Sequence, residues 1–111
     1  MTDCLIGIIK EPEDEELREM GLFNAVSLEC NLPVGGKTKK EAAEKLRDSL
    51  NFHLKKAYEE NRIPFLFNEN VLEELMRYCA ENGFPEALPD IEMGYGLRLR
   101  CYDLTKVAAK V

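Results

Sequence analysis

Three short stretches of the chain have the hydrophobic patterns of β-strands. Residues 4–9 form a continuous apolar run, whereas residues 22–30 and 97–102 alternate between apolar and polar side chains. Alternation with a period of two places the apolar side chains on one face of a strand. We therefore expect the first two stretches to pair as antiparallel strands, the second of them half-buried. The third should point Leu97, Leu99 and Cys101 to the core.

Longer periodicity predicts two helices. Apolar residues recur at helical spacing over about 39–60, and Thr38 followed by Glu41 has the spacing of a capping box that would begin this helix. The apolar stripe of this helix comprises Ala43, Leu46, Leu50, Leu54 and Ala57. A second helix is expected from Asn70 to Gly83, because Asn favours helix starts and Gly favours helix ends. Its apolar face comprises Val71, Leu72, Leu75, Met76 and Cys79.

The remaining segments are predicted to be connections. Pro64 interrupts the apolar residues 63–67, so a strand there would be an edge strand or begin after the proline. Residues 83–96 contain three glycines and two prolines, which is typical of a loop. Residues 104–111 fit either a short helix or a tail.

The predicted fold class is α+β. We expect a small, mainly antiparallel sheet with the long helix packed on one face and the second, shorter helix over an edge or the far end of the first. A chain of 111 residues is long enough for one domain, and two halves would each lack core, so a single domain over 1–111 is expected.

The net charge of −6 resides in one segment. Six acidic residues lie within residues 11–19, and without them the remaining 15 acidic residues equal the 15 basic ones. They are Glu11, Glu13, Asp14, Glu15, Glu16 and Glu19. We expect an exposed hairpin connection here, either a solvated loop or a surface for a basic partner. Direct nucleic-acid binding is disfavoured, because it depends on concentrated Lys and Arg.

The cysteines have no metal-binding or redox spacing. Cys4, Cys30, Cys79 and Cys101 are at least 22 positions apart, and each lies in an apolar stretch, so we expect buried, reduced thiols. No apolar run approaches the roughly 20 residues of a membrane-spanning helix. The N-terminal stretch also lacks the features of a signal peptide. These observations predict a cytoplasmic protein that does not enter the membrane.

One loop required comparison with the phosphate-binding P-loop, G-x-x-x-x-G-K-[ST]. Gly36-Lys37-Thr38 match its end, but Asn31 replaces the first glycine and Pro33 removes an amide. A turn followed by a capped helix is therefore favoured, and phosphate or nucleotide binding at this loop is kept as an alternative.

Nothing else in the sequence indicates an active site. The only histidine, His53, has no nucleophile placed beside it, and we expect it to be partly buried and structural. We expect no catalytic residue, cofactor or metal site, and therefore no enzyme.

Two features are better interpreted as contact surfaces. Arg98, Arg100 and Tyr102 share the outward face of the last strand, and Arg and Tyr are enriched at protein interfaces. That face is either solvated or binds a partner, or the strand lies at the sheet edge and pairs into a homodimer. Phe52 falls on the charged face of the long helix. It would contact the C-terminal half of the same chain, which we favour, or another protein.

Part of the chain resembles the HicB-like antitoxin domain. The resemblance covers about residues 4–58. Its elements are CLIGIIKE, then Gly21, Phe23, Ala25, Glu29-Cys30-Asn31-Leu32-Pro33, Gly36-Lys37-Thr38 and Glu41-Ala42. It implies a β-β-β-α-β core over about residues 1–60, related to a reduced RNase H-like sheet, with a helix-plus-strand extension over about residues 61–111. It also implies a non-catalytic protein that neutralises a small ribonuclease toxin.

We therefore expect a protein-binding module, either a HicB-like antitoxin of a toxin–antitoxin system or an orphan relative, with a small basic toxin-like protein as its partner. Family members often continue into a DNA-binding segment, but GFPEALPD stands where a second DNA-binding helix would be needed. One alternative is an acidic regulatory or inhibitory protein, for example of phage origin, that binds a basic target. The other is phosphate binding at residues 36–38.

Overall fold

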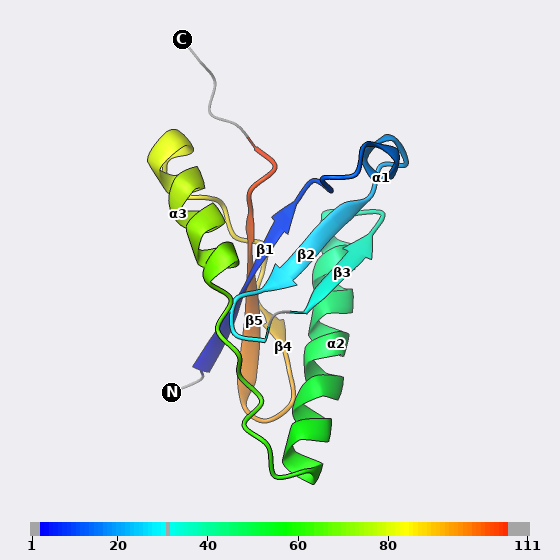
Figure 1. Cartoon of the computed structure of the whole chain (residues 1–111), viewed down its shortest axis with the longest axis vertical. Helices are drawn as coiled ribbons and strands as arrows, with labels where there is room; N and C mark the ends of the chain where they lie inside the picture. Colours follow the sequence, from blue (N-terminus) through cyan, green and yellow to red (C-terminus); the bar gives the residue numbers. More distant parts are fainter. Residues whose placement is uncertain (1–2, 31, 107–111) are drawn as a thin grey trace.

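A computed structural model describes residues 3–30 and 32–106 (Figure 1). The strands are β1 (Asp3–Lys10), β2 (Phe23–Ser27), β3 (Pro33–Gly36), β4 (Ile91–Glu92) and β5 (Leu97–Asp103). The helices are α1 (Glu15–Glu19), α2 (Lys39–Glu59) and α3 (Glu69–Asn82). The predicted α+β class, with one long and one shorter helix, is confirmed.

The five strands form one sheet in the order β3-β2-β1-β5-β4. Three neighbouring pairs are antiparallel, and β1 and β5 are parallel at the centre of the sheet. The sheet is therefore mixed and mainly antiparallel, as predicted. Two of its strands were not predicted from periodicity, because β3 and the two-residue β4 lie in stretches interpreted as connections.

Helix α2 covers one face of the sheet with the predicted apolar stripe. All five stripe residues are fully buried, and the core on this face also contains Leu5, Ile9 and Leu99. A glycine allows the close approach at the centre: a Cβ on Gly7 would lie 2.9 Å from Leu46 Cδ2. The long helix is thus held against β1 by shape as well as by hydrophobicity.

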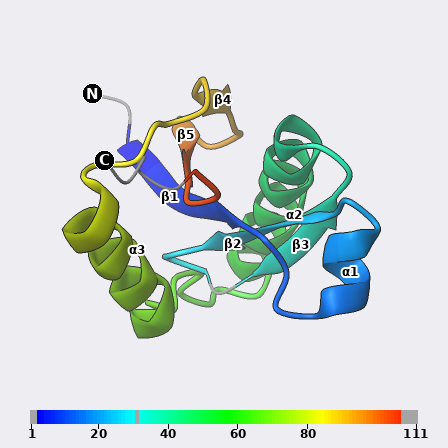
Figure 2. The ribbon, with the colours of Figure 1, turned by 90° about the horizontal axis from the view of Figure 1, so that it is seen from above.

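Helix α3 covers the face of the sheet opposite α2 (Figure 2), so the expectation that it would lie over a sheet edge or the far end of α2 is wrong. Its buried Val71 packs against Ile8 and Val26, whose neighbours along the strands point to the α2 face. Strand β2 is consequently covered on both faces, and the expectation of a half-buried strand over 22–30 is wrong. The strand ends at Ser27, and Cys30 lies in the following turn, buried in the core beneath α2.

The helix termini follow local side-chain chemistry. Thr38 begins α2 as predicted, because its Oγ1 accepts a hydrogen bond of 3.0 Å from the Glu41 amide. Helix α3 begins earlier than predicted, since Asn68 and not Asn70 is the N-cap. Gly83 ends α3 with φ of 80°, a conformation that favours glycine.

Strand β5 is not a sheet edge. Its Leu97, Leu99 and Cys101 point to the α2 face as predicted, but its outer side pairs with β4. The preceding chain continues this cover, since the Leu88 amide donates to the Cys101 carbonyl. Homodimerisation through an exposed edge of β5 is therefore wrong. The helix or tail considered for 104–111 falls largely on residues 107–111, which lie outside the described residues.

Candidate partner-binding surface

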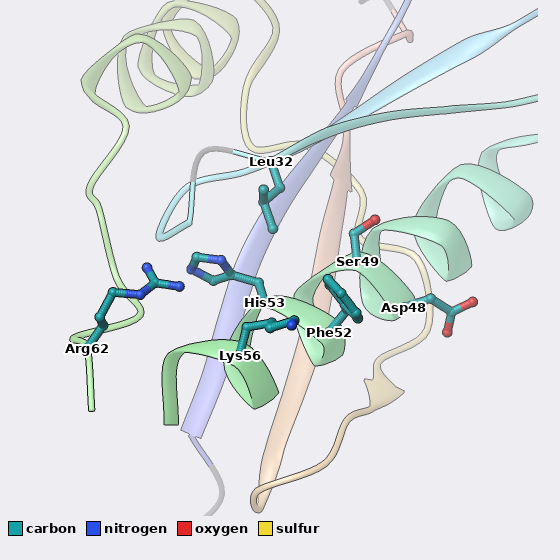
Figure 3. Close-up of a pocket in the computed structure, with 7 residues that line it drawn as sticks. All are labelled: Leu32, Asp48, Ser49, Phe52, His53, Lys56 and Arg62. Carbon is teal, nitrogen blue, oxygen red and sulfur yellow. The ribbon is translucent and has the colours of Figure 1, made fainter. Parts of the chain in front are cut away.

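An open pocket of about 600 Å³ lies along the exposed side of α2. Figure 3 shows Phe52, His53 and Lys56 projecting from α2, with Leu32 pointing towards them from the connection between β2 and β3. Arg62 stands at one end of the pocket. The full lining is Leu32, Asp48, Ser49, Phe52, His53, Lys56 and Arg62.

Phe52 is the main apolar group at this pocket. Its side chain is 64 % exposed, and its described ring contact is with Lys56, whose Nζ lies 5.8 Å from the ring centroid. The expected contact between Phe52 and the C-terminal half of the chain is not confirmed, because the described contacts of that half with α2 are made at Asn51 and Tyr58 instead. An aromatic ring left in solvent beside a hollow is typical of a contact residue.

His53 has the structural role predicted for it. It is half-buried, and its Nε2 lies 2.5 Å from the Pro64 carbonyl. Because a carbonyl oxygen can only accept, Nε2 carries the proton. The hydrogen bond fixes residues 63–67 beside the pocket.

Residues 63–67, which we call the apolar segment, follow α2 in irregular conformation and are largely exposed. Pro64 is buried, but Ile63 is 85 % and Leu66 66 % exposed, and Phe65 and Phe67 are also exposed. The sequence allowed an edge strand at residues 63–67, and these residues form no strand in the structure. Apolar side chains gathered in solvent indicate an interaction surface.

The turn after β2 holds the apolar segment in place. The Leu66 amide donates to the Glu29 carbonyl at 2.7 Å, and the Asn68 amide donates to the Leu28 carbonyl at 2.8 Å. The Glu29 carboxylate in turn accepts from the Ile6 amide of β1, with both oxygens at 2.9 Å. Burial raises the pKa of Glu29, and the Ile6 amide opposes that rise.

The predicted Arg and Tyr face lies elsewhere, on the side of the sheet away from α2. Arg98 is exposed, but Arg100 makes two hydrogen bonds of 2.8 and 2.9 Å to Asp90. The guanidinium of Arg100 holds the pKa of Asp90 below its usual range. Tyr102 packs edge-on against Phe84, with the ring centroids 5.4 Å apart. Two of the three residues therefore already have partners in the chain.

The structure does not bring the four predicted contact residues together. Phe52 projects from α2 on one side of the sheet, whereas Arg98, Arg100 and Tyr102 point to the other side. The sequence missed the apolar segment as a surface, although the uncharged run IPFLF was its signal.

The acidic residues of 11–19 are all exposed, as expected. Part of this connection forms the short helix α1, which was not predicted. Asp14 caps α1 by accepting a hydrogen bond of 2.9 Å from the Glu16 amide. The carboxylates thus stand in solvent on an ordered turn between β1 and β2.

Gly36, Lys37 and Thr38 have structural positions. Gly36 ends β3, where a Cβ would lie 2.5 Å from the Ala42 amide nitrogen, and Thr38 caps α2. Lys37 is exposed between them. Asn31, which stands at the first P-loop position, lies outside the described residues.

The thiols are less uniformly buried than expected. Cys30 and Cys101 are buried, whereas Cys4 and Cys79 are half-buried, and all four are free. Burial raises the pKa of Cys101 to about 12, which makes it a poor nucleophile.

Within residues 3–30 and 32–106, no three His, Cys, Asp or Glu residues are grouped so that they would hold a metal ion. None of the described helices has the length and apolar character needed to cross a membrane. In comparisons with known proteins, no family model matches this chain, and no curated protein or solved structure matches it significantly.

Proposed function

We propose that this chain is a non-catalytic protein-binding module that holds its partner at the pocket around Phe52. The observation that carries the proposal is the exposed Phe52 ring beside an open hollow, next to a second apolar surface at residues 63–67. Aromatic anchors that bury large area on binding often dominate interface affinity. A protein partner would cover both the ring and the hollow.

The sharper form of the proposal is a HicB-like antitoxin that neutralises a small basic toxin in the cytoplasm. The fold supports it, since β1, β2, β3 and α2 follow one another and a later strand joins the sheet beside β1, the succession that the resemblance implies. Free thiols suit a reducing compartment.

The exposed acidic segment suits a basic partner. Six carboxylates on one connection attract a positively charged protein and speed its encounter, an effect that salt weakens. The same exposure supports the alternative of an acidic regulatory or inhibitory protein with a basic target. In that alternative, the carboxylates rather than Phe52 would provide most of the affinity.

Co-expression with any small basic protein that is encoded next to this chain tests the antitoxin proposal. That protein should arrest growth alone, and the wild-type chain should restore growth and bind it in calorimetry. Phe52→Ser should weaken binding at least tenfold, as expected for an aromatic anchor. Met76→Ser, which alters a comparably exposed residue of α3, should bind like wild type.

The outcomes separate the two partner proposals. If Phe52→Ser binds normally and neutralisation of residues 11–19 abolishes binding, the acidic-target alternative replaces the pocket. If no adjacent small protein arrests growth, the antitoxin form is wrong. Thermal melts should coincide for both serine variants, because exposed substitutions change stability by only about 0.5 kcal/mol.

A further inference from the structure

The pocket around Phe52 contains one cation whose charge is not balanced. The carboxylate and the guanidinium of its lining, Asp48 and Arg62, each form an ion pair with a neighbour outside the pocket. Among the described residues, Lys56 has no ion-pair partner, and its Nζ lies 5.8 Å from the centre of the Phe52 ring (Figure 3). The pocket therefore suits an occupant that brings an apolar group to the ring and a carboxylate to Lys56.

Residues 11–22, which we call the acidic connection, present these two kinds of group together. Met20 is 68 % exposed at the end of α1, and Leu17 and Glu16 precede it by three and four positions, so they share one side of the helical turn. Backbone hydrogen bonds order this turn, since the Met20 amide donates to the Glu16 carbonyl at 3.1 Å. Groups that are ordered before binding lose less conformational entropy when they bind.

The acidic connection lies too far from the pocket of its own molecule to occupy it. Gly36 at the end of β3 pairs with Phe23, so Met20, three residues before Phe23, is held beside the start of α2 (Figure 1). Phe52 lies thirteen residues beyond Lys39, the first residue of α2, which is about 20 Å along the helix. An acidic connection that enters the pocket must come from another molecule.

We propose that the acidic connection of one copy of this chain occupies the pocket around Phe52 of a second copy. Met20 packs on the Phe52 ring, a contact that its polarisable sulfur favours, and the Glu16 carboxylate meets Lys56. Charge complementarity favours this occupant, because the acidic connection carries six acidic residues and one basic residue. The contact joins two different surfaces of the chain, so it is a head-to-tail contact.

Sedimentation equilibrium of the full chain tests the association. The average mass of the wild type should rise with protein concentration and fall when salt is added, because salt screens exposed charges. Met20→Ser and Phe52→Ser should each weaken the association at least tenfold, since each removes one side of the apolar contact. Met76→Ser alters a comparably exposed methionine of α3 and should associate like wild type. A wild type that stays monomeric, or a Met20→Ser variant that associates normally, would overturn the proposal.

Mixing the two weakened variants tests whether these surfaces meet each other. The intact pocket of Met20→Ser can accept the intact acidic connection of Phe52→Ser. The mixture should therefore associate more strongly than either variant alone. Two residues that act at separate interfaces, or that only support the monomer fold, would give no gain on mixing, and that result would contradict the head-to-tail contact.

A matched pair of lysines separates the pocket contact from the overall charge. Lys56→Glu should weaken the association at least tenfold, because carboxylates would then meet in the pocket. Lys55→Glu makes the same change in net charge at an exposed residue outside the pocket lining, and its effect should be several-fold smaller. Equal weakening by both variants would show that net charge drives the association and would refute the contact at Lys56.

This inference shares the pocket with the proposed function, but its test requires no partner protein. A partner bound at Phe52 should displace the second copy and return the chain to monomers. If the chain stays monomeric and a partner still depends on Phe52, only this inference fails. If the chain associates through Phe52 and no partner depends on that residue, only the proposed function fails.

Discussion

Gly36→Ala should destabilise the fold through a backbone collision. A Cβ at this position would lie 2.5 Å from the Ala42 nitrogen and 2.9 Å from its Cα, both backbone atoms in the first turns of α2. Such atoms cannot rotate away, so α2 must shift as a unit against β3. Overpacking of this kind costs about 1–3 kcal/mol, occasionally more. Urea denaturation should show a lower midpoint, with a melting temperature reduced by at least about 4 °C.

Gly35→Ala is the matched control. Its Cβ would have its nearest neighbour at 3.8 Å, and Gly35 does not need a left-handed conformation. Loss of glycine's freedom in the unfolded chain should leave this variant equal to wild type or up to about 1 kcal/mol more stable. Equal stability of the two variants would refute the argument from close packing. It would also reopen the interpretation of Gly36 as a glycine kept for phosphate.

Three further predictions concern stability. Thr38→Ala should cost about 1 kcal/mol of unfolding free energy in urea titrations, because the Glu41 amide loses its acceptor. Replacing the six acidic residues of 11–19 by Ser and Gln should leave the melting temperature nearly unchanged, and loss of the fold would show that they make essential contacts. Burial raises the pKa of Asp103, but hydrogen bonds from Lys39 and Thr105 outweigh this and lower it overall. The stability that the Asp103 carboxylate contributes to the fold is therefore present above its unfolded pKa of about 3.9. It is lost as the pH falls through the pKa of Asp103 in the folded state. Asp103→Asn should be about 1–3 kcal/mol less stable at neutral pH, and the difference should shrink in acid.

The elements with long or strict periodicity were predictable from the sequence. Helix α2 repeats its apolar positions over about four turns, and the burial of β5 alternates along the strand, so burial and local pattern agree. The N-cap at Thr38 was also predictable, because one side chain decides it. In each of these elements, residues close together in the sequence determine the structure.

The strands β3 and β4 were not predictable from periodicity, because too few residues carry it. Strand β3 is Pro-Val-Gly-Gly, which contains residues that local rules assign to turns. It forms because its backbone pairs antiparallel with β2. Strand β2 was misjudged for a related reason. Its Asn24, Ala25 and Ser27 are small or polar, and nothing local reveals that α3 covers its second face.

The contact residues were even harder to predict from local sequence patterns than these strands. Arg100 and Tyr102 point outward as predicted, but both have partners from a loop that lies 10 to 18 residues earlier in the sequence. Asp90 accepts hydrogen bonds from Arg100, and Phe84 packs against Tyr102. The run IPFLF has the composition of a buried strand, but the helices on either side fix its course outside the sheet. Which outward residues remain free therefore depends on tertiary contacts, and alternation alone indicates only which way a side chain points.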